Sequence, residues 1–121
     1  MLPTSNPDFW RMLEGMIESC EIIIDRPKGS HHPRFDEIIY PLDYGYLAGT
    51  KSMDGEGIDL WLGSDPARRL TAVFITVDPE KMDSEIKLMV GCTEDEISTI
   101  NHFFNDYASM KALLILREED K

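Results

Sequence analysis

The sequence predicts an α+β domain, mainly β, in which helices accompany a small sheet or barrel. Two stretches, one near each end of the chain, repeat apolar side chains at the spacing of helical turns. Between them lie short runs of apolar and β-branched residues separated by turn residues, a pattern typical of strands. With 121 residues, the chain is expected to form a single domain over residues 1–121 with one modest core.

The first element is expected to be a helix near the N-terminus. Ser5 or Asn6 can cap it, and Pro7 suits its first turn. Its core face is predicted to contain Phe9, Met12, Leu13, Met16 and Ile17. Short strands are expected at residues 22–24, 58–62, 70–77, 87–90 and 112–116. Turns or loops are expected at residues 26–33, 41–43, 49–57 and 64–66.

The second helix is predicted to begin after Thr93. Thr93 with Glu96 has the spacing of a capping box, in which each residue satisfies a backbone N–H of the other. The apolar stripe that follows contains Ile97, Ile100, Phe103, Phe104 and Tyr107. The predicted order is therefore helix, several short strands, helix and a closing strand.

Charge and composition exclude several classes of function. The chain has 23 acidic and 12 basic residues and a formal net charge of −11, so no nucleic-acid partner is expected. A small phosphorylated substrate remains compatible, because bound metal ions can invert the local field. No apolar run approaches the roughly 20 residues of a membrane span, and the first residues do not resemble a signal peptide. We therefore expect a cytoplasmic protein with no membrane partner.

The two cysteines, Cys20 and Cys92, do not have the spacing of a metal site. We expect two reduced thiols, with a disulfide between them as the alternative.

A turn with three carboxylates is the strongest sign of chemistry in the chain. Asp54, Glu56 and Asp59 lie within six residues, directly before an apolar run. Hard divalent cations such as Mg²⁺ are held by such oxygens. The spacing does not fit an EF-hand loop, because its sixth position should be glycine. The alternative is a solvated hairpin turn, in which Gly55 and Gly57 supply the backbone freedom.

Two further charged segments could join this turn. An acidic stretch at residues 78–85 precedes the strand expected at residues 87–90, and carboxylates at strand ends can converge at one end of a barrel. Around residues 25–36, basic Lys28 and Arg34 accompany acidic residues, which suits a site for phosphate and metal together. Both segments could equally be solvated loops. The adjacent pair of His31 and His32 is expected to lie at the surface.

The segment Tyr40-Pro41-Leu42-Asp43-Tyr44-Gly45 and the turn Asp54-Gly55-Glu56-Gly57-Ile58-Asp59 carry a resemblance to a known family. They resemble the signature of the soluble family I inorganic pyrophosphatases, which reads Tyr-Pro-x-x-Tyr-Gly, a spacer, and Asp-Gly-Asp-Pro-x-Asp. Supporting similarities lie at residues 24–30, 34–36, 85–88 and 102–107. The resemblance runs in order from about residue 22 to residue 116.

This resemblance implies a small OB-like closed β-barrel, flanked by an N-terminal and a C-terminal helix. It implies hydrolysis of pyrophosphate to two phosphates with Mg²⁺ by a homo-oligomer. Mn²⁺ is the alternative metal, because both ions accept oxygen-rich octahedral sites. By position, the central metal ligands would be Asp54, Asp59 and Glu85, with further acids at Asp78 or Glu80, Asp25 and Asp36. Glu56 would help to deprotonate the attacking water, and the phosphate contacts would be Arg34, Tyr44, Lys87 and Tyr107.

The chain also departs from the family pattern. It has Glu56 and Glu85 where the family has aspartate, and Ala108 where the family has lysine. Only three residues separate Asp36 from Tyr40, so the arginine-bearing hairpin of the family is nearly absent. Two alternatives therefore stand beside pyrophosphate hydrolysis: metal-dependent hydrolysis of another small phosphate compound, and a catalytically degenerate binding module.

Overall fold

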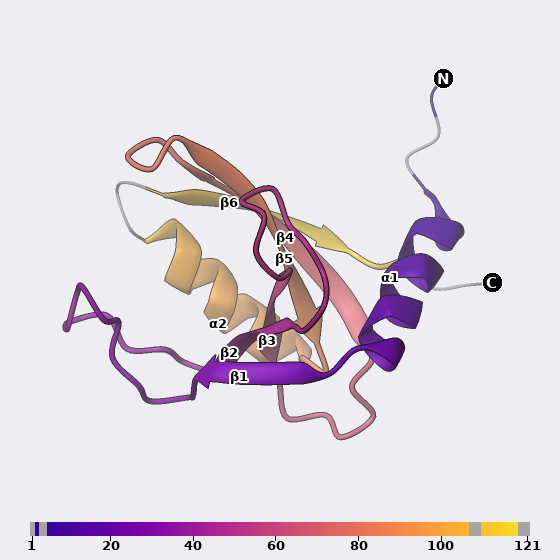
Figure 1. The fold of residues 1–121 in the computed structure, drawn as a ribbon, viewed down its shortest axis with the longest axis horizontal. Coiled ribbons are helices and arrows are strands. Elements are labelled where there is room, and N and C mark those ends of the chain that lie inside the picture. Colours follow the sequence, from indigo (N-terminus) through magenta and orange to yellow (C-terminus); the bar gives the residue numbers. More distant parts are fainter. Residues whose placement is uncertain (1, 3–4, 107–109, 119–121) are drawn as a thin grey trace.

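The computed structural model describes residues 2, 5–106 and 110–118, which form two helices and six strands (Figure 1). The helices are α1 (Pro7–Ser19) and α2 (Glu94–Asn105). The strands are β1 (Ile22–Arg26), β2 (Asp43–Leu47), β3 (Asp59–Leu62), β4 (Leu70–Asp78), β5 (Asp83–Val90) and β6 (Lys111–Leu116). Among the described residues, no helix is both long and apolar enough to cross a lipid bilayer.

The strands form one mixed sheet in the order β1-β2-β3-β5-β4-β6. Only the central pair β3–β5 is parallel, and the other neighbours are antiparallel. Within the described ranges, β1 pairs only with β2 and β6 only with β4, so the predicted closed β-barrel is wrong and the sheet is open. Figure 1 shows β1 and β6 at opposite sides of the molecule, with α2 between them.

A capped edge helps to explain why the sheet stays open. Asn105, at the end of α2, accepts a hydrogen bond at Oδ1 from the backbone N–H of Ala112 at 2.8 Å. Closure would need free backbone groups on β6 to pair with another strand, and this donor is already satisfied by the helix.

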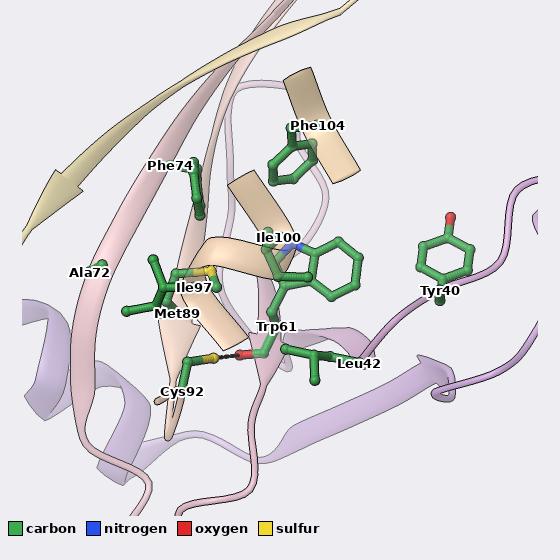
Figure 2. Close-up of a cluster of buried hydrophobic side chains, with 10 residues drawn as sticks. All are labelled: Tyr40, Leu42, Trp61, Ala72, Phe74, Met89, Cys92, Ile97, Ile100 and Phe104. Atoms are coloured by element: carbon green, nitrogen blue, oxygen red, sulfur yellow. Dashed lines mark hydrogen bonds between the residues drawn. The ribbon is translucent and has the colours of Figure 1, made fainter. Parts of the chain in front are cut away.

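Each face of the sheet is covered by one helix, because strand residues alternate between the two faces. Trp61, Phe74 and Met89 pack against α2 in the cluster drawn in Figure 2. Leu60 and Leu88, which directly precede Trp61 and Met89 in the sequence, pack on the opposite face with residues of α1. The core is thus two apolar layers that share β3, β4 and β5.

The first core layer also buries Cys92, whose thiol donates to the carbonyl oxygen of Trp61 at 3.8 Å (Figure 2). Burial raises the pKa of this thiol to about 12, so it is protonated and unreactive at neutral pH. Both Cys92 and Cys20 are free thiols.

Local signals define the helix ends. The side chain of Asn6 accepts a hydrogen bond from Phe9 N and caps α1, as predicted. The predicted capping box of Thr93 and Glu96 is present at α2. Strand β5 begins at Asp83, four residues before the predicted start at residue 87, because its polar first half pairs with β4 across the hairpin.

A glycine lets β1 and β2 approach closely, and a bulge then changes the direction of β1 at its end. A Cβ on Gly45 would lie 1.8 Å from the carbonyl oxygen of Ile23, so only glycine fits at this crossing of the strands. Further along, the register slips between Ile24 and Arg26, leaving Asp25 as an extra residue in β1. Such bulges bend a strand and redirect its side chains.

Candidate functional site

A cavity of about 600 Å³ lies at the ends of β1, β2, β3 and β5 and beside the turn that precedes β3. Its walls are mainly charged. They consist of Asp25, Arg26, Tyr44, Tyr46, Asp54, Glu56, Gly57, Asp59, Lys81, Asp83, Glu85 and Lys87. Neighbouring strands position the central residues, since Asp59 in β3 lies directly opposite Lys87 in β5.

The ammonium group of Lys87 is the centre of a hydrogen-bonded cluster. Its Nζ lies 2.6 Å from Asp59 Oδ2, 2.7 Å from Glu85 Oε2 and 3.0 Å from the hydroxyl of Tyr44. The Tyr44 hydroxyl in turn donates to Asp59 Oδ2 at 2.7 Å. Tyr44 is held in place by an edge-on contact with Trp61, whose ring centroid is 4.7 Å away. The cluster is therefore braced by the apolar core beneath it.

The cluster keeps both of its proton donors protonated. Burial raises the pKa of the Tyr44 hydroxyl, and the nearby Asp59 carboxylate adds to this effect while Lys87 opposes it. Burial alone would lower the pKa of Lys87, but Tyr44, Asp59 and Glu85 raise it above its ordinary value. At neutral pH, the cavity therefore presents a cationic amine and a neutral phenol to whatever enters it.

The acidic turn is held by its own hydrogen bonds. Asp54 Oδ1 accepts from the hydroxyl of Ser52 at 2.5 Å and from the backbone N–H of Glu56 at 2.9 Å. These bonds, with the Ser52 hydroxyl contributing most, lower the pKa of Asp54. Asp54 and Glu56 are both exposed, so they form the solvent-facing wall of the cavity.

The donor set fits a hard divalent cation in its chemistry, because carboxylate oxygens of Asp54, Asp59 and Glu85 line one cavity. In the described part of the chain, however, no three His, Cys, Asp or Glu side chains are already arranged to hold one metal ion. The ammonium of Lys87 lies between Asp59 and Glu85 instead. A metal at this pair would need these side chains to turn.

Among the described residues, four predicted site residues do not line this cavity: Arg34, Asp36, Asp78 and Glu80. Arg34 and Asp36 lie on the exposed loop before β2, where the carboxylate of Asp36 is 3.6 Å from His31. Asp78 is buried and accepts hydrogen bonds from the backbone N–H groups of Glu80 and Lys81, at 3.1 and 3.3 Å, which shapes the turn between β4 and β5. Tyr107 and the substitution at Ala108 lie outside the described residues.

Sequence reasoning gave no role to two charged residues of the cavity, Arg26 and Lys81, and left Asp83 open as one of three possible acids beside Asp78 and Glu80. It also missed Tyr46, which lies two residues from Tyr44 on the same strand and so on the same face. That period of two was available in the sequence. The orientation of Arg26 depends on the bulge in β1, for which the sequence gives no local signal.

Known proteins resemble this chain in structure and not in sequence. No family model matches the chain, and no curated protein matches it by sequence. Solved structures do match. An inorganic pyrophosphatase from Neisseria gonorrhoeae has a TM-score of 0.59 and 19% sequence identity, with 74% of this chain and 77% of that chain covered.

Two further matches are similar in extent. The inorganic pyrophosphatase of Helicobacter pylori has a TM-score of 0.57 and 17% identity, over 81% of this chain and 83% of that one. The enzyme from Coxiella burnetii has a TM-score of 0.56 and 15% identity, over 80% and 84%. At such identities the likeness concerns the fold alone. The chain therefore has a fold similar to that of bacterial inorganic pyrophosphatases.

Proposed function

We propose that the protein is a Mg²⁺-dependent inorganic diphosphatase that hydrolyses pyrophosphate to two phosphates, with Mn²⁺ as an alternative metal. The supporting observation is one cavity, in a pyrophosphatase-like fold, that combines many carboxylates with the paired ammonium of Lys87 and the hydroxyl of Tyr44. An acidic cavity suits an anionic substrate only if cations accompany it.

In this proposal, Asp54, Asp59 and Glu85 hold the metal. When bound, the ion offsets charge on the phosphate oxygens and makes water more acidic. Asp54 is suited to this role because its lowered pKa keeps it ionised well below neutral pH. The aspartate on β3 and the glutamate on β5 come from adjacent, directly paired strands, so their spacing is set by the sheet.

Lys87 and Tyr44 would bind the phosphate oxygens. The amine carries its charge throughout the neutral range, and the phenol keeps its proton, so both can donate hydrogen bonds to an oxyanion. When substrate enters, Lys87 would exchange part of its bonding to Asp59 and Glu85 for bonding to phosphate. That exchange would leave the two carboxylates available to a metal.

Glu56 would accept the proton of the attacking water. It lies on the same turn as Asp54, exposed at the wall of the cavity. The water oxygen forms a bond to one phosphorus, the bond from that phosphorus to the bridging oxygen breaks, and the second phosphate leaves. One water proton stays on the new phosphate, the other passes through Glu56, and a proton returns to the former bridging oxygen of the leaving group, so the products are two hydrogen phosphate ions.

The test is phosphate release from pyrophosphate across a Mg²⁺ titration, with Asp59→Asn as the key variant. Removing this charge should lower kcat/KM by about 100-fold or more, in line with the loss of an electrostatic group at a reacting centre. Asp95→Asn is the matched control, since it removes the same charge from the exposed first turn of α2. Metal-independent release, or equal rates for the two variants, would reject the proposal.

A second candidate is hydrolysis of a larger phosphate compound. A cavity of about 600 Å³ falls in the range of pockets that enclose whole small molecules, which leaves room beyond a diphosphate. The same assay with a panel of phosphate monoesters and a nucleoside triphosphate separates the two. Faster metal-dependent turnover of one of these than of pyrophosphate would favour the second candidate.

A further inference from the structure

We propose that Arg26 and Lys81 form an anion-binding wall of the cavity and hold the phosphate group that lies away from Asp59 and Glu85. The inference rests on the proposed function, because it assigns the second phosphate of that substrate. It gives the role of phosphate-binding cation to Arg26, where the sequence resemblance points to Arg34.

The bulge in β1 accounts for the position of Arg26. Successive residues of a regular strand point to opposite faces, yet Asp25 and Arg26 both line the cavity. The extra residue at Asp25 makes this possible, and Arg26 is then paired with Tyr44, one of the residues that bind Lys87. The bulge therefore brings a guanidinium to the site.

Tyr40 fixes that guanidinium. The Nη1 of Arg26 donates to the Tyr40 hydroxyl at 2.5 Å, and the guanidinium carbon lies 5.5 Å from the centre of the Tyr40 ring. Tyr40 is only 4% exposed and belongs to the cluster of Figure 2, with Trp61 5.8 Å away between ring centroids. An arginine has five N–H donors in a rigid fork, and Tyr40 takes only one of them. The remaining donors suit the oxygens of a phosphate.

The two cations have no carboxylate of their own. Six acidic residues line the same cavity: Asp25, Asp54, Glu56, Asp59, Asp83 and Glu85. Even so, in the part of the chain that the structure describes, neither Arg26 nor Lys81 lies within ion-pair distance of a carboxylate. Lys87, by contrast, is paired with two. Arg26 is attracted by the charge of Asp25 without an ion-pair contact, so its free N–H donors are available to an anion from outside.

Arg26 and Lys81 also share a neighbour in His32, which lies beside these cavity residues, on the ring of Tyr40. His32 stacks on Tyr40 with ring centroids 6.3 Å apart and an angle of 9° between planes. Burial lowers the pKa of His32, and the positive charges of Arg26, Lys81 and Arg34 lower it further, while the carboxylate of Glu37 opposes them. These cations therefore act together on one imidazole, whereas the ammonium of Lys87 is already paired with the carboxylates of Asp59 and Glu85.

This division of charge defines the substrate class. One phosphate group would lie at the acidic side, where cations must accompany it, and a second would meet Arg26 and Lys81 directly. A compound with two linked phosphate groups satisfies both sides, whereas a single phosphate satisfies only one. The wall thus replaces the arginine-bearing hairpin that is nearly absent between Asp36 and Tyr40.

The test is calorimetric binding of methylenediphosphonate, a non-hydrolysable diphosphate analogue, in Mg²⁺, and of inorganic phosphate in a parallel series. Arg26→Gln should weaken diphosphonate binding and raise KM for pyrophosphate by roughly 10- to 100-fold, the value of a charge-assisted contact. Arg26→Lys should recover part of the loss. Arg69→Gln, an exposed arginine outside this cavity, is the matched control and should bind within about 2-fold of the wild type.

Arg26→Gln also removes the hydrogen bond to Tyr40 and could harm folding. Lys81→Gln is the second variant, because Lys81 is exposed and its replacement should leave the fold intact. Its expected effect is a roughly 3- to 10-fold weaker diphosphonate affinity without a change in melting temperature. A merely structural role for Arg26 would lower the melting temperature and leave the affinity of the folded protein unchanged, and that result would overturn the proposal.

The outcomes distinguish this inference from the proposed function. Turnover of pyrophosphate with full diphosphonate affinity in both Arg26→Gln and Lys81→Gln would overturn the wall and leave the function standing. The wall would likewise be overturned if Arg34→Gln weakened binding and Arg26→Gln did not. No turnover, but phosphate binding that depends on Arg26, would reject the function and support the wall. A wild-type protein that binds neither phosphate nor diphosphonate would overturn the wall.

Discussion

At the scale of single residues, Lys87 holds together two carboxylates that would otherwise repel each other. The side chains of Asp59 and Glu85 are 28% and 12% exposed, and that of Lys87 is 10% exposed. A charge so poorly hydrated is costly unless it is paired. In the proposed function the same three residues meet metal and substrate, so that proposal makes stability and activity depend on the same contacts.

We predict that Lys87→Met destabilises the protein by about 2–3 kcal/mol in the absence of divalent metal, because Asp59 and Glu85 lose their counter-ion. Mg²⁺ should restore more stability to this variant than to the wild type, since it can take the place of the lost charge. Urea unfolding with and without Mg²⁺, at matched ionic strength, measures both effects. Lys51→Met, at an exposed lysine, should change stability little in either condition. Equal metal responses in Lys87→Met and the wild type would contradict the interpretation.

The contribution of the sequence to the site differs from residue to residue. Asp54 and Asp59 could be predicted from an acidic turn that follows a Tyr-Gly segment, and Glu85 from a separate similarity to the same family at residues 85–88. Arg26 could not be found in this way, because its place in the cavity depends on a one-residue slip between two paired strands. Such a slip is a property of the pair, and a single strand does not encode it.

At the scale of elements, Glu96 ties the start of α2 to the end of β3. Its carboxylate accepts hydrogen bonds from the backbone N–H of Thr93 at 2.9 Å and from the backbone N–H of Ser64 at 3.1 Å. It also accepts from the Ser64 hydroxyl at 3.1 Å. Burial would raise the pKa of Glu96, but these bonds outweigh it and lower the pKa below its ordinary value of 4.5.

We predict that Glu96→Gln costs about 1 kcal/mol at pH 7, the usual value of a helix cap. Because the folded pKa lies below the unfolded one, the contribution of the carboxylate is complete above about pH 4.5 and is lost as pH falls through the folded pKa. The gap in unfolding free energy between variant and wild type should therefore shrink in acid. Urea titrations at pH 7 and pH 3 measure it, with Glu94→Gln, in the same helical turn, as control. A gap independent of pH would show that the charge is not responsible.

Helix ends could be predicted because their signals are local. Asn6 and the pair of Thr93 and Glu96 act within three or four residues, so the sequence alone identifies them. The start of β5 could not be predicted in the same way. Three of residues 83–86 are polar, and this segment becomes a strand only by pairing with β4. Pairing partners far along the chain decide such boundaries.

At the scale of the whole molecule, the two apolar layers depend on the same three strands. Trp10 belongs to α1 and packs in the layer between that helix and the sheet, and Trp61 of β3 packs in the layer beneath α2. Because β3, β4 and β5 contribute side chains to both layers, neither face can lose its packing while the other keeps an intact sheet.

We predict a single cooperative unfolding transition, seen equally from both faces. The chain has two tryptophans, so Trp10→Phe leaves Trp61 as a reporter of one layer and Trp61→Phe leaves Trp10 as a reporter of the other. In each variant, the fluorescence midpoint in urea should coincide with the midpoint from far-ultraviolet circular dichroism. Separate midpoints within one variant would mean that the layers unfold independently.

The closed barrel was the part of the fold that the sequence did not predict correctly. The strands and their order along the chain were mostly recognisable, but closure depends on whether the two outer strands pair with each other. Here the backbone N–H of Ala112 in β6 is bonded to Asn105, and α2 lies between β6 and β1. The hydrogen bond between the Asn105 side chain and Ala112, 7 residues further along the chain, thus helps to keep the sheet open.

The parallel pairing of β3 with β5 has a consequence for the order of folding. The hairpin of β4 and β5 joins residues close in sequence, so it can form early. Asp59 and Lys87, by contrast, are 28 residues apart and meet only when β3 has crossed over the hairpin to lie beside β5. We therefore expect the charged cluster to be among the last parts to assemble. A phosphate compound would therefore bind only to chains that have completed folding, so the fraction of chains that binds it equals the fraction that is native.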